Sequence, residues 1–160
     1  MVALVDHGEA VESWIWRAEQ RAMYVAEQGG GATRDGVRLR ASYRLDGTAG
    51  LRGAVLTRFL DGRTKARIAA RRHRFCEVSA GRRCAGSEYP AVLEGDQDFV
   101  PFWRALPWDH APGALLVREA RGVVSHLDGT PYQSTFDREG LLVAAGQATW
   151  QSVRNAIFDP

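Results

Sequence analysis

Two histidine–carboxylate pairs are the side chains of this sequence that could perform acid–base chemistry. Asp109 and His110 are adjacent, and His126 lies two residues before Asp128. A carboxylate that orients an imidazole can make it a general base. Adjacent residues of a strand point to opposite faces, however, and Asp128 precedes a glycine, where an aspartate commonly binds the amides of a turn. We therefore expect both pairs to be structural and assign no catalytic residue, while an enzyme with His110 or His126 in a cavity stays an alternative.

Motifs for nucleophilic, phosphate-binding or metal chemistry are absent from the sequence. It has no G-x-S-x-G, no G-x-x-x-x-G-K-[ST], no H-E-x-x-H and no C-x-x-C. The glycine run at 29–31 follows an expected helix, whereas a phosphate loop opens one. His7 and His73 stand alone and offer no metal-ligand spacing. We expect no metal ion and no other cofactor.

The basic residues gather in the middle of the chain, between acidic ends. Residues 34–83 include 14 basic and four acidic residues, although the formal net charge of the whole chain is +2. In alternating strands these basic side chains share one face, which can bind an anionic surface or an acidic protein partner. The candidates for this face are Arg38, Arg40, Arg58 and Arg67. A solvated outer face, balanced by the acidic ends, is the alternative.

The positions of the aromatic residues in the same strands indicate whether the basic face suits a nucleic-acid partner. A platform for single-stranded nucleic acid combines basic and aromatic side chains on one face. Tyr43 and Phe59 fall instead on the opposite, apolar face of the predicted strands. The pattern therefore argues against nucleic acid.

The two cysteines, Cys76 and Cys84, flank an expected turn near Gly81. A disulfide across such a hairpin would stabilise the fold by roughly 2.5 kcal/mol and would imply an oxidising compartment. The N-terminus has no basic region and too short an apolar stretch for a signal peptide. The alternative is a pair of reduced, partly buried thiols. We expect a location in the cell envelope if a leader was removed, and in the cytoplasm otherwise.

Composition and periodicity predict how these residues are positioned. The chain of 160 residues is 45% hydrophobic and 25% charged, which is typical of one globular domain, and it has no apolar run of about 20 residues that could cross a bilayer. Apolar residues at Val11, Trp14, Ile15 and Ala18 have helical spacing and continue to Ala26, which predicts a helix over 7–28.

From residue 37 onward the apolar period becomes two. This predicts basic antiparallel strands over 37–89, a lid-like irregular segment over 90–113 that contains four prolines, and further antiparallel strands over 114–150. An Asp61-Gly62 pair within the basic region predicts a hairpin turn. The predicted fold class is α+β, with the N-terminal helix packed on the concave face of a curved antiparallel sheet of about seven strands, an open barrel.

Large aromatic side chains are abundant in the predicted helix and lid. A helix and a lid over a curved sheet can enclose a cavity for an apolar or lipid-like ligand. The candidate lining residues are Trp14, Ala18, Tyr43, Phe59, Phe102, Trp103 and Trp108. Filling of the interior by the same side chains is the alternative.

Two resemblances follow from this order of elements. A helix followed by hairpins such as Leu127–Gly140 resembles the bacterial lipoprotein-carrier and lipoprotein-localisation families, whose open barrels bind acyl chains. The segment Arg17–Gln28 is similar to the amphipathic part of the N-terminal helix of type IV minor pilins. The first resemblance implies a non-enzymatic carrier of an apolar or amphipathic ligand, and the second implies a subunit of a pilus or secretion system. A small-molecule enzyme with an open-barrel cavity is the third hypothesis.

Overall fold

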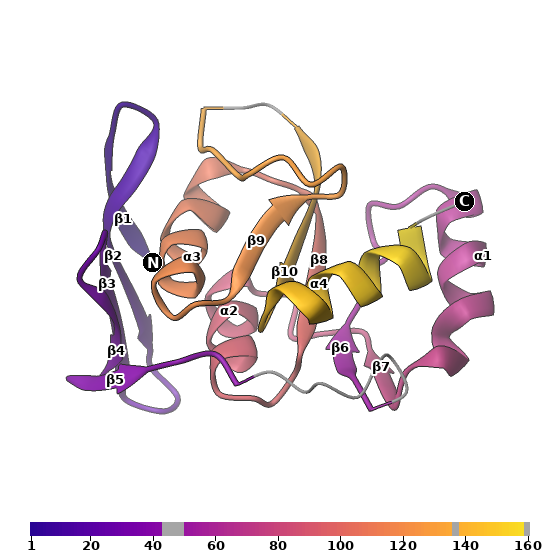
Figure 1. The fold of residues 1–160 in the computed structure, drawn as a ribbon, viewed down its shortest axis with the longest axis horizontal. Coiled ribbons are helices and arrows are strands. Elements are labelled where there is room, and N and C mark those ends of the chain that lie inside the picture. The colour runs from indigo at the N-terminus through magenta and orange to yellow at the C-terminus, as the bar shows by residue number, and fades with distance from the viewer. Residues whose placement is uncertain (43–49, 136–137, 159–160) are drawn as a thin grey trace.

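The computed structural model describes residues 1–42, 50–135 and 138–158. Two sheets and two helical layers alternate along the long axis of the molecule (Figure 1). The first sheet lies at one end, followed by helices α2 (Ala85–Leu93) and α3 (Pro107–Glu119), and then by the second sheet. Helices α1 (Gly62–Arg71) and α4 (Gln147–Val153) lie on the far side of the second sheet.

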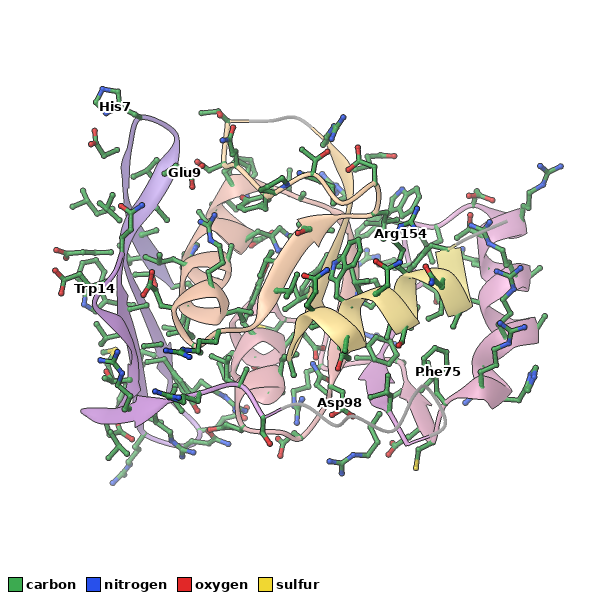
Figure 2. All side chains as sticks on the ribbon, viewed as in Figure 1. His7, Glu9, Trp14, Phe75, Asp98 and Arg154 are labelled. Carbon is green, nitrogen blue, oxygen red and sulfur yellow. The ribbon has the colours of Figure 1, made fainter. Side chains whose placement is uncertain are left out.

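The first sheet is a five-stranded antiparallel meander in which each strand pairs with the next along the chain. Within it, Ile15 pairs with Tyr24, and both side chains are buried on the face that packs against α3. Trp14 points to the opposite face, away from the helices (Figure 2). Trp16, on the same outer face, is 52% exposed. The strands are β1 (Val2–Asp6), β2 (Glu9–Arg17), β3 (Ala22–Glu27), β4 (Gly31–Arg34) and β5 (Val37–Leu39).

The predicted helix over 7–28 is therefore wrong, because this segment forms β2 and β3 and the turn between them. Both faces of β2 carry large apolar residues, with Ile15 inside and Trp14 and Trp16 outside. A strand with two apolar faces produces pairs at i, i+3 and i+4 that imitate an amphipathic helix. Arg21, in the turn, has a φ of 50°, a left-handed conformation that ends regular structure.

The second sheet is mixed and is buried on both faces. Its order is β7-β6-β8-β10-β9, with β6 parallel to β7 and β8 and with β10 antiparallel to β8 and β9. Leu141 and Val143 belong to the cluster around α2 and α3, while Leu142 and Ala144 belong to the cluster around Trp150 of α4. The strands are β6 (Arg52–Ala54), β7 (Glu77–Ser79), β8 (Phe99–Arg104), β9 (Val123–His126) and β10 (Glu139–Ala144).

Helices replace several predicted strands and the predicted lid. The Asp61-Gly62 pair does not turn a hairpin but begins α1, where the Asp61 carboxylate accepts a hydrogen bond of 2.9 Å from the Thr64 amide. The 90–113 segment contains β8 and the start of α3, whose Pro107 stands at the first helical position, where a missing amide costs nothing. Two short helical segments continue α1 and α4, namely η1 (Arg72–Arg74) and η2 (Arg154–Phe158).

The predicted open barrel is consequently wrong as well. The chain has α and β elements in separate layers, with two sheets kept apart by α2 and α3 instead of one curved sheet around a helix. Within the three described ranges, no helix is long and apolar enough to cross a membrane.

Candidate functional site

A cavity of about 680 Å³ opens where five parts of the chain meet. These are Met1, the loop after β6, the N-terminal end of α2, the C-terminal end of β8 and the first turn of α3. Its charged lining residues are Arg58, Arg83, Arg104 and Asp109, all of them exposed. Apolar side chains from Leu56, Phe59, Phe102, Trp103 and Leu106 form much of the remaining wall.

The electrostatics of this cavity favour an anion. Its described lining includes three arginines and a single carboxylate. Cys84 is the N-cap of α2, and its side chain makes no capping hydrogen bond. The first amides of a helix carry partial positive charge, which adds to that of the nearby Arg83. The cavity therefore combines fixed positive charge with one potential proton acceptor, Asp109.

His110 is buried beneath the cavity and has no ring nitrogen left for proton transfer. Its Nε2 lies 2.9 Å from the Arg104 carbonyl oxygen, which can only accept, so Nε2 donates. Its Nδ1 accepts from the Tyr89 hydroxyl at 2.9 Å. Burial lowers the pKa of His110 to about 4, because the charged imidazolium would lose its hydration. His110 is therefore a neutral anchor that holds the first turn of α3, including Asp109, against β8.

The other predicted pair, His126 and Asp128, is also engaged in structural contacts. His126 is buried, with its Nδ1 3.2 Å from the Gly140 carbonyl oxygen. Asp128 accepts hydrogen bonds from the Thr130 amide at 2.9 Å and from Arg138 at 2.8 Å. The hydrogen bonds from Thr130 lower the pKa of the exposed Asp128 carboxyl. These contacts close the turn after β9, away from the residues that line the cavity.

The structure brings together three of the seven predicted cavity residues. Phe59, Phe102 and Trp103 line the 680 Å³ cavity. Trp108 is 70% exposed on α3 and is not part of the lining. Two further candidates do not line the cavity, because Trp14 is on the outer face of the first sheet and Ala18 is exposed in the turn after β2. Tyr43 is outside the described residues.

The predicted basic face does not exist as one surface. Arg38 is on β5, where it donates to the Gly30 carbonyl oxygen at 2.9 Å, and Arg40 follows that strand. Arg67 is on α1, at the other end of the molecule (Figure 1). Arg58 alone of the four lines the cavity. The four residues were expected on adjacent strands, but Arg38 and Arg40 lie in and directly after β5, Arg58 lies in the loop after β6, and Arg67 lies on α1.

Cys76 and Cys84 are free thiols, and both are exposed. The expected hairpin between them is absent, because β7 pairs in parallel with β6 and the chain then enters α2. Cys84 instead lines the cavity. The disulfide prediction relied on a return strand that this topology does not contain.

Sequence reasoning did not single out Arg83, Arg104 or the role of Asp109 at the cavity. They lie on the N-terminal end of α2, the end of β8 and the start of α3, and they meet because these ends lie at one edge of the second sheet. The sequence contained one signal of this site. Pro107 and Pro112 flank Asp109, and because proline is common at the first position of a helix, Pro107 indicated a helix that begins beside Asp109.

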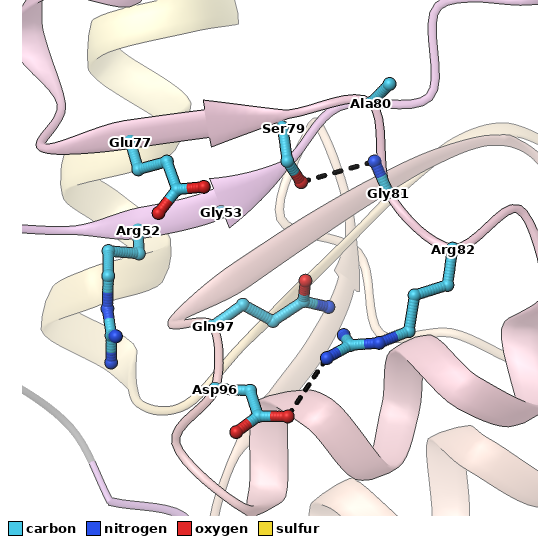
Figure 3. A pocket seen from close by; sticks show the side chains of 9 residues that line it. All are labelled: Arg52, Gly53, Glu77, Ser79, Ala80, Gly81, Arg82, Asp96 and Gln97. Atoms are coloured by element: carbon cyan, nitrogen blue, oxygen red, sulfur yellow. Dashed lines mark hydrogen bonds and ion pairs between the residues drawn. The ribbon is translucent and has the colours of Figure 1, made fainter. Parts of the chain in front are cut away.

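A second cavity, of about 290 Å³, lies beside β6 and β7 (Figure 3). Three of its four charged lining residues have partners, since Arg82 contacts Asp96 at 2.9 Å and Arg52 donates to the Gly95 carbonyl oxygen at 2.8 Å, and the fourth is Glu77. Ser79 Oγ accepts from the Gly81 amide at 3.2 Å. These internal contacts make it a weaker candidate for a charged ligand than the 680 Å³ cavity.

A divalent cation is a common partner of phosphate groups in enzymes. Such an ion takes several oxygen ligands, and the 680 Å³ cavity offers one carboxylate, Asp109. In the part of the chain that the structure describes, no group of three or more His, Cys, Asp or Glu side chains could hold a metal ion. These residues do not by themselves fit a metal centre.

Comparison with known proteins gives first the class of this fold. A staphylococcal IMPase-II bound to 2'-AMP has a TM-score of 0.82 and 21% identity, over 99% of this chain and 60% of that one. The same enzyme bound to inositol monophosphate has a TM-score of 0.80 and 21% identity, over 97% of this chain and 60% of that one. The layered α+β architecture is thus that of the inositol monophosphatases.

Sequence comparison then gives the family itself. The model of the inositol monophosphatase family matches residues 1–158, and the chain belongs to this family. The inositol-1-monophosphatase of Mesorhizobium japonicum is 31% identical over 99% of this chain and 59% of its own length. The chain therefore spans about 60% of the length of the relatives that it matches.

Family membership overturns both resemblances drawn from the order of elements. The chain is related neither to the lipoprotein carriers nor to the type IV minor pilins, because the helix on which both resemblances depended is a pair of strands. A non-enzymatic lipid carrier is also wrong as a function. The family points to a phosphatase, which favours the third hypothesis, a small-molecule enzyme.

Proposed function

We propose that this chain forms the substrate-binding part of a phosphatase that hydrolyses small phosphate monoesters. The observation that carries this proposal is the cavity lined by Arg58, Arg83 and Arg104 together with Asp109. Membership of a phosphatase family supports the same function. Because the chain spans about 60% of its relatives, we take the cavity to be the share of the active site that this part of the family fold supplies.

Positioning and charge stabilisation are the main tasks of an enzyme that transfers a phosphoryl group. The guanidinium groups of Arg83 and Arg104 and the first amides of α2 would hold the phosphate oxygens. Water attacks phosphorus, the ester P–O bond breaks, and the leaving alcohol oxygen takes up a proton that the attacking water gives up, which yields inorganic phosphate and the alcohol. Asp109 lies where its carboxylate would accept a hydrogen bond from the attacking water and orient it.

Candidate substrates follow from the relatives. Solved family members bind 2'-AMP and inositol monophosphate, so both belong in an assay of this protein. Release of inorganic phosphate from each compound is the measurement, made on the protein as it occurs naturally. Asp109→Asn should lower kcat by about 100-fold or more. Asp128→Asn, a carboxylate in a turn away from the cavity, is the matched control and should leave the rate unchanged.

Two outcomes would overturn this proposal. One is the absence of phosphate release from every monoester tested. The other is an Asp109→Asn variant with full activity, because the cavity would then not be the site of the reaction.

We also propose that the protein acts in the cytoplasm. The support is the pair of exposed free thiols, Cys76 and Cys84, which suit a reducing compartment. Cell fractionation followed by immunoblotting tests this location, and recovery of the protein with the periplasmic fraction would contradict it.

A further inference from the structure

We propose that Glu88, a buried residue of α2, is the positioning residue that holds Arg83 at the 680 Å³ cavity. This inference rests on the proposed function, in which Arg83 binds a phosphate oxygen, and it adds a residue that lies outside the cavity lining. Three observations support it, namely the contacts of the Glu88 carboxylate, the place of the loop at 80–84 beside both cavities, and the backbone conformation of that loop.

Glu88 is fully buried, with an exposed fraction of 0%, although glutamate is rarely found in an interior without partners. One carboxylate oxygen accepts a hydrogen bond from the backbone amide of Arg82. The other accepts from Nε2 of Gln97 at 2.9 Å, and the same Nε2 lies 3.2 Å from the backbone carbonyl oxygen of Glu88. Because a buried carboxylate is costly without such donors, these contacts fix the loop before α2 to Glu88.

The loop at 80–84 forms part of the wall of both cavities. Ala80 lines both of them, whereas Arg82 lines the 290 Å³ cavity and Arg83 lines the 680 Å³ cavity. The guanidinium of Arg82 contacts Asp96 at 2.9 Å (Figure 3), and its other terminal nitrogen lies 4.0 Å from Glu88. Arg82 is therefore engaged with the protein itself, and Arg83 is the arginine that this loop presents to a phosphate.

The backbone of the same loop is held in an unfavourable conformation. Arg83 has a φ of 58°, in the left-handed region that residues with a β-carbon seldom adopt. Gly81 has a φ of 70°, and a β-carbon there would lie 2.6 Å from Oε1 of Glu88. Left-handed residues persist only where surrounding contacts fix the backbone, and they gather at functional sites. The bond from the Arg82 amide to Glu88 thus holds the next residue, Arg83, in the conformation that places it at the cavity.

Calorimetric titration of inorganic phosphate tests this role. Glu88→Ala should weaken phosphate binding about 5- to 10-fold, up to the loss expected for Arg83→Gln. Glu88→Gln keeps a carbonyl oxygen for the Arg82 amide, and the Gln97 amide can reverse to accept from it, so its affinity should stay within about 2-fold of the wild type. The matched control is Glu94→Ala, which removes the carboxylate at the other end of α2 and should leave phosphate affinity unchanged.

A double variant separates positioning from a general loss of stability. Because Glu88 acts through Arg83, adding Glu88→Ala to Arg83→Gln should weaken phosphate by no more than about 2-fold beyond Arg83→Gln alone. Gly81→Ala disturbs the same contact from the loop, should weaken phosphate as Glu88→Ala does, and replaces that variant in both measurements if it does not fold. Its control is Gly36→Ala, at a similar φ of 81° but with nothing within 4 Å.

The possible failures are distinguishable. Wild-type affinity in Glu88→Ala or in its replacement, equal losses in Glu88→Ala and Glu88→Gln, or losses that add in full to that of Arg83→Gln would overturn the positioning role, while a phosphate site remains. A wild type that does not bind phosphate would overturn the proposed function together with the inference.

Discussion

His110 Nε2 donates a hydrogen bond of 2.9 Å to the carbonyl oxygen of Arg104. This contact fixes the first turn of α3 to the end of β8. The hydroxyl of Tyr89, on α2, donates to Nδ1 of the same imidazole at 2.9 Å. One buried ring thus joins three of the elements that line the cavity. The position of Asp109, the preceding residue, depends on that ring.

The low pKa of His110 predicts that the protein loses stability in mild acid. Above pH 6.5 the imidazole is neutral in both states and the folded protein has its full stability. Below that pH the unfolded chain binds a proton that the folded protein takes up only near pH 4. The free energy of unfolding therefore falls, by up to about 1.4 kcal/mol per pH unit between pH 6.5 and pH 4.

Urea denaturation of the wild type and His110→Gln at pH 7 and pH 5 measures this effect. The variant should be less stable at pH 7, because it loses hydrogen bonds, but it should lose about 2 kcal/mol less than the wild type on going to pH 5. The exposed His73 gives the control, since His73→Gln should keep the wild-type pH dependence. An unchanged pH dependence in His110→Gln would contradict a buried, neutral His110.

Glu94 connects the end of α2 to the first sheet. Its carboxylate accepts hydrogen bonds from Arg17 at 3.3 Å, from Arg34 and from the Tyr24 hydroxyl. Burial, with Glu94 nearby, raises the pKa of Tyr24 to about 12, so the phenol stays protonated and donates. We predict that Glu94→Gln lowers the free energy of unfolding by about 2 kcal/mol, since two arginines then lose a half-buried partner.

Chemical denaturation of Glu94→Gln, with Asp128→Asn as the control variant, checks that prediction. Asp128 pairs with Arg138 at the surface, where both side chains are about half exposed, and its loss should cost less than about 1 kcal/mol. Equal losses in the two variants would show that Glu94 does not hold the sheet to the helical layer.

Gly113 allows α3 to approach α2 closely. A β-carbon at this position would lie 2.2 Å from Cδ2 of the fully buried Tyr89, a distance that requires the helices to separate. We predict that Gly113→Ala destabilises the fold by about 3 kcal/mol and disturbs the Tyr89–His110 contact. Gly62→Ala, where nothing lies within 4 Å, is the control in another helix and should change stability by no more than about 1 kcal/mol. Thermal unfolding of both variants measures this difference in stability. A Gly113→Ala protein as stable as the control would contradict the close packing of α3 on α2.

Local alternation in the sequence predicted some strands correctly. Val37 and Leu39 lie in β5, and the region after residue 114 contains β9 paired antiparallel with β10. In β5 the apolar Val37 and Leu39 alternate with a charged residue, so the period of two is plain in the sequence. The cavity residues Phe59, Phe102 and Trp103 could also be singled out, because large aromatic side chains in irregular segments commonly line ligand sites.

Most of the architecture could not be predicted from local patterns. Trp14 and Ile15 belong to opposite faces of one strand, but they lie three and four residues after Val11, which is the spacing of a helix. In α1 the opposite error occurs, because Arg63, Lys65 and Arg67 alternate with smaller residues while Thr64 and Ile68, four residues apart, are the buried pair. The site depends on where α2, α3 and β8 end in space, and that relation is set by tertiary packing.

Binding of inorganic phosphate tests most directly whether the cavity of Arg58, Arg83, Arg104 and Asp109 is a phosphate site. We would titrate phosphate into the wild type, into Arg83→Gln and into Arg38→Gln, which replaces an exposed arginine of the first sheet. We predict that Arg83→Gln weakens phosphate binding about 10-fold, through loss of a charge-assisted hydrogen bond, while Arg38→Gln binds as the wild type does. Equal affinity in all three proteins, or no binding to the wild type, would contradict it.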